Sequence, residues 1–379
     1  MKNDVRNQFL LEPNVTFLNH GSFGACPKPI FEDYQHWQKK LEQQPVLFST
    51  ETVYEQLRQS RTALGDFVGC HEQDLVFFQN PTTAVSNIIF SLELKPGDEI
   101  LMSNHEYGAL VRAWSKWGRR QQVKIVQQEV KLPVTTRENF TDNFWAGVTQ
   151  RTKVIFLSQI TSATALEFPV QSLCELARKK GILTIIDGAH VPGQMDLNLN
   201  ELDCDFYTGA CHKWLCAPKG TSFLYVKKEH QPWVRPLIYS WGKDGDDPGP
   251  SEFLQDFQWQ GTRDMAAFLT LPKVIQFFQE HIEGKRLSCK KLIRKTSAEL
   301  ARLFNTPPIY SSADWIHQMV SHPLPVNAPE DIKERLWSAY KIEIPVFQWC
   351  GQRYIRVSCN VYNTDQQVEY FLNALRSLI

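Results

Sequence analysis

The chain has 379 residues, and its 41 lysine and arginine residues are equal in number to its 41 aspartate and glutamate residues. Because the net charge is zero and no long run of one sign occurs, the sequence favours a small-molecule partner over nucleic acid or a membrane surface. The nine cysteines form no CxxC pair, and neither a leader segment nor a spanning run is visible, which predicts reduced thiols and a cytoplasmic location.

Strand-like and helix-like segments alternate through the first two-thirds of the chain. Helical spacing over residues 49–68, stopped by Gly69, is followed by a second helix after Asn80 and a third over residues 171–180. Apolar runs predict strands over residues 75–78, 99–102, 123–126, 154–157, 182–186, 204–207 and 222–226. Continuous apolar strands separated by helices indicate an α/β fold with a buried, mainly parallel sheet.

The pattern changes after residue 265. A long helical stretch over residues 266–304, with a break at Gly284 and Lys285, leads into mixed elements. We expect strands over residues 315–320, 342–349 and 354–359, a helix over residues 330–340 and a last helix from Thr364. The predicted organisation is a large domain over residues 20–265 and a smaller α+β domain over residues 266–379, joined by the N-terminal segment 1–19.

Asp187 and His190 directly follow the apolar strand over residues 182–186. Ligands collect at the carboxyl ends of strands in open α/β sheets, so this aspartate is placed to act on a ligand. Asp187-Gly188 is also a common turn dipeptide, and a simple turn explains it equally well on its own.

Lys213 stands between His212 and Trp214, just beyond the predicted strand over residues 204–207. Burial would lower its pKa and leave a nucleophilic amine suited to Schiff-base chemistry, although a single lysine is usually a surface charge. Together with Asp187 it suggests a pyridoxal phosphate site, because that cofactor needs a lysine for its aldehyde and an acid for its ring nitrogen.

Thr82 and Thr83 follow Asn80-Pro81 at the predicted start of a helix. Hydroxyl groups and free N–H groups at a helix N-terminus form an anion site, which would suit the phosphate of a cofactor. Ordinary helix capping is the alternative explanation of this motif.

Four longer stretches resemble the class V aminotransferase superfamily of fold type I, and within it the isopenicillin N epimerase group most closely. They are Phe17–Gly24, Glu106–Ala109, Tyr207–Gly220 and Gln260–Asp264, and the resemblance covers nearly the whole chain. It implies the pyridoxal 5'-phosphate-dependent transferase fold of type I, in which helices sandwich a mainly parallel central sheet and a smaller α+β domain follows. It also implies a homodimer with shared active sites.

The resemblance also assigns roles to single residues. Lys213 is then the Schiff-base lysine, Asp187 the partner of the pyridine nitrogen, His190 the group near the phenolic oxygen, and Tyr107 the ring stacked on the cofactor. The phosphate would be held by Thr82, Thr83 and His212, and by Thr262 of the neighbouring subunit. Asn19 and His20 would line the substrate pocket, and Arg356 would grip the substrate α-carboxylate. No metal site is expected.

The sequence fixes the reaction less well than the cofactor. An epimerase or racemase acting at Cα is the main hypothesis, with Tyr239 and His20 as weak candidates for the second acid. A C–S lyase or cysteine desulfurase and an aminotransferase would use the same lysine and aspartate. Cys350, in an expected hairpin turn, is a poor match to the desulfurase thiol. A non-catalytic binding protein is the remaining alternative.

Overall fold

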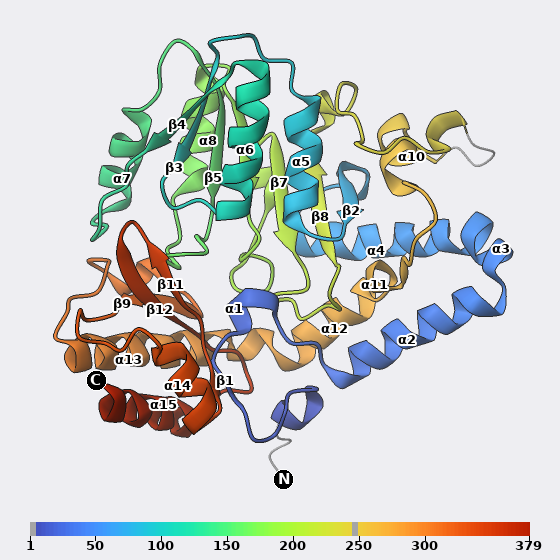
Figure 1. Ribbon diagram of the computed structural model, residues 1–379. Helices are drawn as coiled ribbons and strands as arrows, with labels where there is room; N and C mark the ends of the chain where they lie inside the picture. Colours follow the sequence, from blue (N-terminus) through green and yellow to red (C-terminus); the bar gives the residue numbers. More distant parts are fainter. Residues whose placement is uncertain (1–4, 245–248) are drawn as a thin grey trace.

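The computed structural model describes residues 5–244 and 249–379, without the side chain of Lys243. Its centre is a seven-stranded sheet (Figure 1) with the strand order β2-β8-β7-β6-β5-β3-β4. The strands are β2 (Leu75–Phe78), β3 (Glu99–Ser103), β4 (Lys124–Gln128), β5 (Thr152–Ser158), β6 (Leu183–Asp187), β7 (Phe206–Ala210) and β8 (Ser222–Val226). Only β8 runs against its neighbours. The predicted mainly parallel α/β sheet is therefore confirmed.

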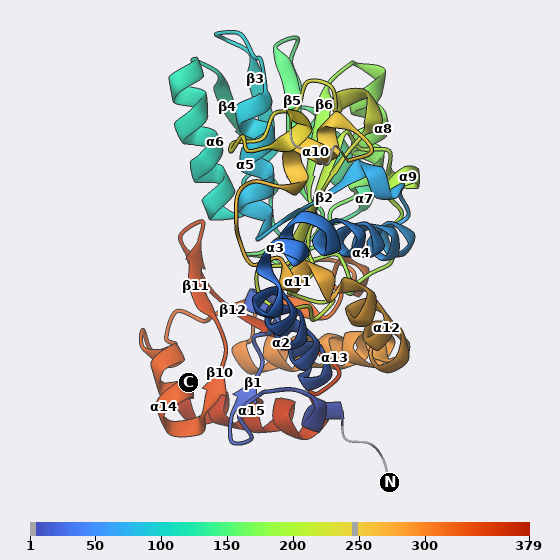
Figure 2. The same ribbon diagram turned by 90° about the vertical axis from the view of Figure 1, so that its right-hand side faces the viewer.

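Helices cover both faces of this sheet (Figure 2). The side chains of β3 alternate between the two faces: Leu101 packs into one hydrophobic core, and Ile100 and Met102 pack into the other. The first core includes side chains of α4 (Val53–Val68), α7 (Arg137–Trp145), α8 (Val170–Lys179) and α9 (Leu199–Leu202). The second includes side chains of α5 (Pro81–Ser91), α6 (Gly108–Gln121) and α10 (Glu252–Gln258). Two-sided burial explains why the strands are continuously apolar.

The C-terminal elements form a separate layer below the large sheet in Figure 1. Its antiparallel sheet has the order β11-β12-β9, and the segment Glu283–Lys285 interrupts the long helical stretch as expected. The elements are α11 (Ala266–Leu269), α12 (Leu271–His281), α13 (Arg286–Phe304), β9 (Met319–Pro323), α14 (Ile332–Tyr340), β10 (Ile342–Glu343), β11 (Val346–Trp349), β12 (Gln352–Ser358) and α15 (Asp365–Leu378). The small α+β layer of the predicted fold is present.

The N-terminal segment crosses onto this C-terminal layer. β1 (Thr16–Phe17) pairs in parallel with β10, and Asn19 bridges to Ser358 at the end of β12. Then follow α1 (His20–Phe23), α2 (Lys28–Gln43), α3 (Pro45–Leu47) and a π-helical turn (Phe48–Thr52) that leads into α4. The domain boundaries stay a prediction, and residues 1–4 of the segment expected to join the domains lie outside the described residues.

The single strand expected over residues 342–349 is two strands, β10 and β11, which are separated by Ile344 and Pro345 and belong to different sheets. Two other strand predictions were displaced along the chain. The strand expected over residues 315–320 is β9 (Met319–Pro323), because Ala313–Trp315 forms a 3-10 turn in which the Ser312 hydroxyl caps the Asp314 amide. The strand expected over residues 204–207 is β7 (Phe206–Ala210), which lies two residues later. In both cases buried apolar residues outside the strand lengthened the apolar run.

No helix in the described part of the chain is long and apolar enough to span a membrane. All nine cysteines are unpaired, and eight of them are buried or half-buried. The cytoplasmic location stays a prediction.

Candidate active site

A cavity of about 540 Å³ opens where the carboxyl ends of the central strands meet α1, the N-terminus of α5 and β12. Eight of the eleven predicted site residues line it together. They are Thr82, Thr83, Tyr107, Asp187, His190, His212, Lys213 and Arg356. Residues separated by up to 274 positions in the chain thus converge at the strand ends, where ligands of open α/β sheets bind.

Lys213 ends a chain of three polar side chains. The indole Nε1 of Trp214 donates to Nδ1 of His190 at 3.3 Å, and Nε2 of His190 lies 3.1 Å from Nζ of Lys213. An indole N–H can only donate, so Nδ1 of His190 accepts and its proton must sit on Nε2. That N–H then donates to the Lys213 nitrogen, which requires the uncharged amine.

Burial supports the same protonation state. Burial and, to a smaller extent, the charge of Arg356 lower the pKa of Lys213 to about 8. The charge of Asp187 opposes this lowering. Burial also holds the pKa of His190 well below its usual 6.5, with the charge of Lys213 adding to the effect. A neutral amine close to physiological pH is the form that attacks an aldehyde.

Asp187 is a buried carboxylate with little compensation from the protein. Its Oδ1 accepts one hydrogen bond, from the amide of Ala189 at 2.9 Å. Burial raises its pKa above 3.8, while the Ala189 amide and the charge of Lys213 oppose that rise. Such a group would be stabilised by a cation bound in the cavity.

Gly188 shows that the Asp-Gly motif is more than a surface turn. A side chain at this position would clash with the hydroxyl of Tyr207, which donates to Oε1 of Gln159 at 2.7 Å. The tyrosine ring is fully buried under the loop that follows Asp187. Glycine is therefore required here for close packing beneath the aspartate.

The start of α5 is capped as expected, and it also lies at the cavity. Asn80 is the N-cap, and its Oδ1 accepts from the amide and the hydroxyl of Thr83 at 2.9 and 3.1 Å. The cap leaves the Thr82 amide and hydroxyl at the cavity, where His212 also lies. Nδ1 of His212 is held by the carbonyl of Thr221 at 2.9 Å, so its Nε2 is the nitrogen left for a ligand.

Arg356 is buried without a carboxylate partner among the described residues. Its Nη1 donates to the carbonyl of Ser162 at 2.6 Å and its Nη2 to the hydroxyl of Ser22 at 2.9 Å, while its buried Nε has no partner. Burial lowers its pKa to about 10. A buried guanidinium with an unused N–H is suited to a planar anion such as a carboxylate. Sequence reasoning gave neither serine a role: Ser162 stands in no distinctive motif, and Ser22 lies in the stretch Phe17–Gly24, of which only Asn19 and His20 were assigned one.

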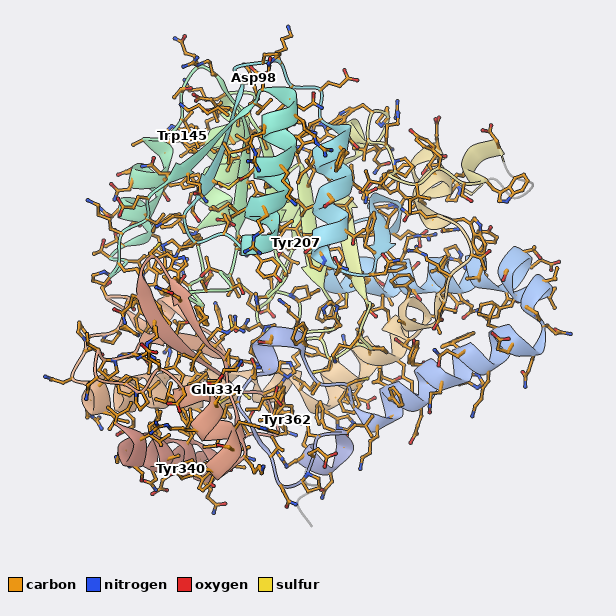
Figure 3. All side chains as sticks on the ribbon, viewed as in Figure 1. Asp98, Trp145, Tyr207, Glu334, Tyr340 and Tyr362 are labelled. Atoms are coloured by element: carbon orange, nitrogen blue, oxygen red, sulfur yellow. The ribbon has the colours of Figure 1, made fainter. Side chains whose placement is uncertain are left out.

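The structure does not bring Asn19, His20 and Thr262 to this cavity wall. The ring of His20 points inward: it bonds the Tyr362 hydroxyl at 2.7 Å and the Lys213 carbonyl at 3.0 Å. Figure 3 shows Tyr362 below Tyr207, on the C-terminal side of the site. The neighbouring residues Gly21, Ser22 and Phe23 line the cavity instead. With its ring turned inward, the buried imidazole of His20 has hydrogen-bond partners, and it does not face the cavity.

Thr262 is exposed and lines a different cavity, of about 360 Å³, together with Trp241. Tyr239, the other candidate for a second acid, is 65% exposed and is not part of the wall around Lys213. Cys350 lies at the tip of the β11–β12 hairpin, outside the wall as well.

The residues at the cavity fit pyridoxal 5'-phosphate. A lysine amine is available for its aldehyde, the sparsely bonded carboxylate of Asp187 for its ring nitrogen, and the capped end of α5 for its phosphate. Tyr107, half-exposed at the mouth, offers an aromatic face. The orphaned Nε of Arg356 leaves one binding position for the carboxylate of a substrate.

Comparison with known proteins gives a family match over most of the chain. The sequence model described as aminotransferase class V matches residues 27–371. Isopenicillin N epimerase of Amycolatopsis lactamdurans is 32% identical over 99% of this chain and 98% of its own length. A probable chloroplastic L-cysteine desulfhydrase of Arabidopsis thaliana is 25% identical over 97% of this chain and 84% of its own length.

A solved structure shows the same fold. A variant of C-DES with glycine covalently linked to its pyridoxal phosphate cofactor superposes with a TM-score of 0.86 at 19% identity, covering 99% of each chain. At that identity the likeness bears on the fold alone, and it agrees with the predicted fold type I.

Proposed function

The chain belongs to the aminotransferase class V family of pyridoxal 5'-phosphate enzymes, and from that premise we propose that it is an epimerase or racemase acting at Cα of an amino-acid substrate. The observation that carries the proposal is the composition of the cavity wall. Apart from Asp187, His190, His212 and Arg356, which we assign to the cofactor and to the substrate carboxylate, its titratable side chains are Lys213 and Tyr107, and it has no thiol among its described residues.

Lys213 is the first proton-transfer group of the proposal. The bound cofactor supplies an electron sink that stabilises negative charge at Cα of the substrate. Because His190 donates to Nζ and burial lowers the pKa of Lys213 to about 8, the free amine can accept the Cα proton near neutral pH.

Tyr107 is the proposed second acid, returning a proton from its Oη to the other face of Cα. The other titratable groups on the described wall already have roles: Asp187 for the ring nitrogen, His190 for Lys213, His212 for the phosphate and Arg356 for the substrate carboxylate. Neither sequence candidate supports this step, since both ring nitrogens of His20 are bonded and Tyr239 lies outside the wall. A ring lying on the cofactor would face Cα from the side away from the lysine.

A C–S lyase of cysteine or cystine is the second candidate, and the likeness to a desulfhydrase favours it. That reaction needs only Lys213 and a leaving group on the β-carbon. A desulfurase would also need a mobile thiol. Cys350 is not part of the wall, and its hairpin is fixed in place: Trp349 donates to the Asn104 carbonyl at 3.1 Å, and its ring centroid lies 4.4 Å from that of His105. Transamination would use the same groups and differs only in where the proton returns.

We also propose that the enzyme is a homodimer in which Thr262 reaches the neighbouring active site. Thr262 is exposed and turned away from the Lys213 cavity of its own subunit. Large apolar side chains are exposed at both cavities, because Phe23 lines the Lys213 cavity and Trp241 lines the cavity that holds Thr262. Exposed apolar surface of this kind is typical of a face covered by a second copy. Phe90, Leu237, Ile238 and Tyr239 are further large apolar residues that are exposed.

The test is incubation of the purified enzyme with a panel of L-amino acids in D2O. An epimerase introduces deuterium at Cα and loses chirality, whereas release of pyruvate, sulfide or alanine without racemisation establishes the lyase reaction. In the Tyr107→Phe variant we expect exchange of the Cα proton to continue while inversion falls by about 10²-fold, the usual contribution of one positioned acid. Equal loss of exchange and inversion would contradict the role of Tyr107. A protein without a visible cofactor band would be a non-catalytic relative.

A further inference from the structure

Glu106 is a buried glutamate beside the active site that sequence reasoning assigned no role. Its Oε1 accepts from the hydroxyl of Ser103 at 2.5 Å, and its Oε2 accepts from the amide and the hydroxyl of Ser158 at 2.8 and 2.6 Å. It is 6% exposed. All its hydrogen bonds come from neutral donors, and no basic group neutralises it in the described part of the chain.

Three adjacent strands connect Glu106 to the aspartate of the site. Ser103 ends β3, Ser158 ends β5 and Asp187 ends β6, and these strands are neighbours in the sheet. Ser158 is the register partner of Asp187 and also lines the cavity. The glutamate therefore holds the strand end next to Asp187.

The charged groups around Glu106 are few. Asp187 on β6 is the one that acts on it electrostatically, and Lys213 after β7 acts in turn on Asp187. On its own segment, His105 is turned away, with its ring nitrogens bonded to Thr164 and to the Val130 carbonyl. The site thus contains two buried carboxyl groups, Asp187 at the end of β6 and Glu106 in the loop after β3, and Lys213 acts on the first of them.

We propose that Glu106 is a positioning residue for the cofactor ring: through Ser158 it fixes the strand end beside Asp187, and it places a second negative charge behind the partner of the ring nitrogen. The inference rests on the binding of pyridoxal phosphate. A second carboxylate behind Asp187 makes the surroundings of the ring more negative, so the cofactor nitrogens hold their protons more firmly. A protonated ring is the better electron sink for a charge at Cα.

Glu106 is poised to exert this effect near neutral pH. Burial and, to a smaller extent, the charge of Asp187 raise its pKa to about 7. The hydrogen bonds from Ser103 and Ser158 oppose this rise. The cation of a bound cofactor would favour its ionised form.

The experiment is a pH titration of the visible absorption band of the cofactor-loaded protein, compared with its Glu106→Gln variant. Glutamine keeps the shape of the side chain and removes the charge. We expect the midpoint of the titration to fall by about one pH unit, the size of shift that one nearby buried charge produces. Glu106→Asp, which keeps the charge, should restore most of the midpoint.

Glu99→Gln is the matched control, because Glu99 is a buried glutamate at the start of β3, the strand that precedes Glu106, and it is held by Thr149 at 2.6 Å and Lys124 at 3.2 Å. It should leave the midpoint unchanged. If Glu106→Gln does not fold, Ser103→Ala tests the same point, since losing that hydrogen bond makes Glu106 harder to ionise and should move the midpoint in the same direction. An unmoved midpoint in a loaded Glu106→Gln or Ser103→Ala protein overturns the inference. Absence of the visible band in the unaltered protein would instead refute the proposed function.

Discussion

The Nε2 atom of His190 lies 3.1 Å from Nζ of Lys213, and the order of donors fixes the direction of the proton between them. Since Trp214 donates to the other ring nitrogen, His190 donates to the lysine and stabilises its neutral form. The hydrogen bond from Trp214, the next residue in the chain, thus favours the neutral, nucleophilic form of the Lys213 amine.

The first prediction concerns that tryptophan. Trp214→Phe removes the indole N–H, so His190 can carry its proton on Nδ1 and accept from a charged Lys213. The pKa of Lys213, which burial lowers to about 8, should then rise, and less free amine should be present at neutral pH. We expect cofactor to bind covalently several-fold more slowly near pH 7 and at the normal rate near pH 9.5.

The measurement is the growth of visible absorbance after pyridoxal phosphate is added to cofactor-free protein over this pH range. Trp233→Phe is the control, because Trp233 donates to Nδ1 of His230 at the same 3.3 Å far from the site. Identical pH dependence in Trp214→Phe and the unaltered protein would contradict the proton order described above.

The second prediction concerns the substrate. In Arg356→Lys the positive charge remains, but the fork of N–H groups is lost, including the unpartnered Nε. Hydrogen bonds to a charged group contribute about 1.5–3 kcal/mol, so KM should rise by roughly 10- to 100-fold while kcat changes little. Steady-state kinetics with the best amino-acid substrate checks this.

Arg353→Lys is the matched control on the same strand. Arg353 donates to the backbone carbonyls of Ala328 and Pro329, away from the cavity. Its replacement should lower thermal stability and leave KM unaltered. If both variants raise KM equally, the role of Arg356 in carboxylate binding is refuted.

The third prediction is that Asp187→Asn stabilises the protein when no cofactor is bound. Burial raises the pKa of Asp187, because the protonated carboxyl group is the form that the folded protein tolerates better. The protonated group therefore stabilises the fold fully below its usual pKa of 3.8, and this stabilisation is lost as the pH rises through the raised pKa. At pH 8 the variant should be more stable by about 1 kcal/mol, and near pH 4 the difference should shrink. Bound cofactor should reverse the order at pH 8.

Denaturant unfolding at the two pH values, with and without pyridoxal phosphate, measures this effect. Asp205→Asn should behave oppositely, because hydrogen bonds from His230 and Thr184 lower the pKa of Asp205 although its burial opposes them. A less stable cofactor-free Asp187→Asn protein at pH 8 would show that Asp187 is satisfied without a ligand.

Much of this site was predictable because its residues stand in local motifs. Asp187, His190 and Lys213 follow apolar strands, and the topology of a parallel sheet brings strand ends to one edge. The Asn80 cap likewise marked the start of α5. Local sequence signals and tertiary structure agree at these positions.

The remaining features depend on long-range contacts. Glu106 begins one of the family-like stretches, but its role shows only when Ser158, 52 residues later, is seen to donate to it. The inward turn of His20 depends on Tyr362, which is 342 residues away. Helix α2 was not predicted although Ile30, Trp37 and Leu41 recur at helical spacing and pack on the core, because Ile30 is its only fully buried residue and charged or polar residues separate the others.

The fourth prediction tests whether two subunits share each site. Lys213→Ala should abolish the visible band, and Thr262→Asp should weaken cofactor binding by placing a negative charge against the phosphate. Thr262 is exposed, so this substitution should leave the fold of its own subunit intact. Each variant alone should therefore form inactive homodimers.

Mixing the two variants, with unfolding and refolding to exchange subunits, should restore activity. In a hybrid dimer, Lys213 of the Thr262→Asp subunit meets the intact Thr262 of the other subunit, which makes one complete site. Random pairing gives half hybrids with one working site of two, so about a quarter of the unaltered activity should return. The control is a mixture of Lys219→Ala with Thr262→Asp. Because Lys219→Ala homodimers should be active, this mixture should recover more than a quarter of the unaltered activity. If Thr262 served its own subunit, or if the chain acted as a monomer, the mixture of Lys213→Ala and Thr262→Asp would stay inactive.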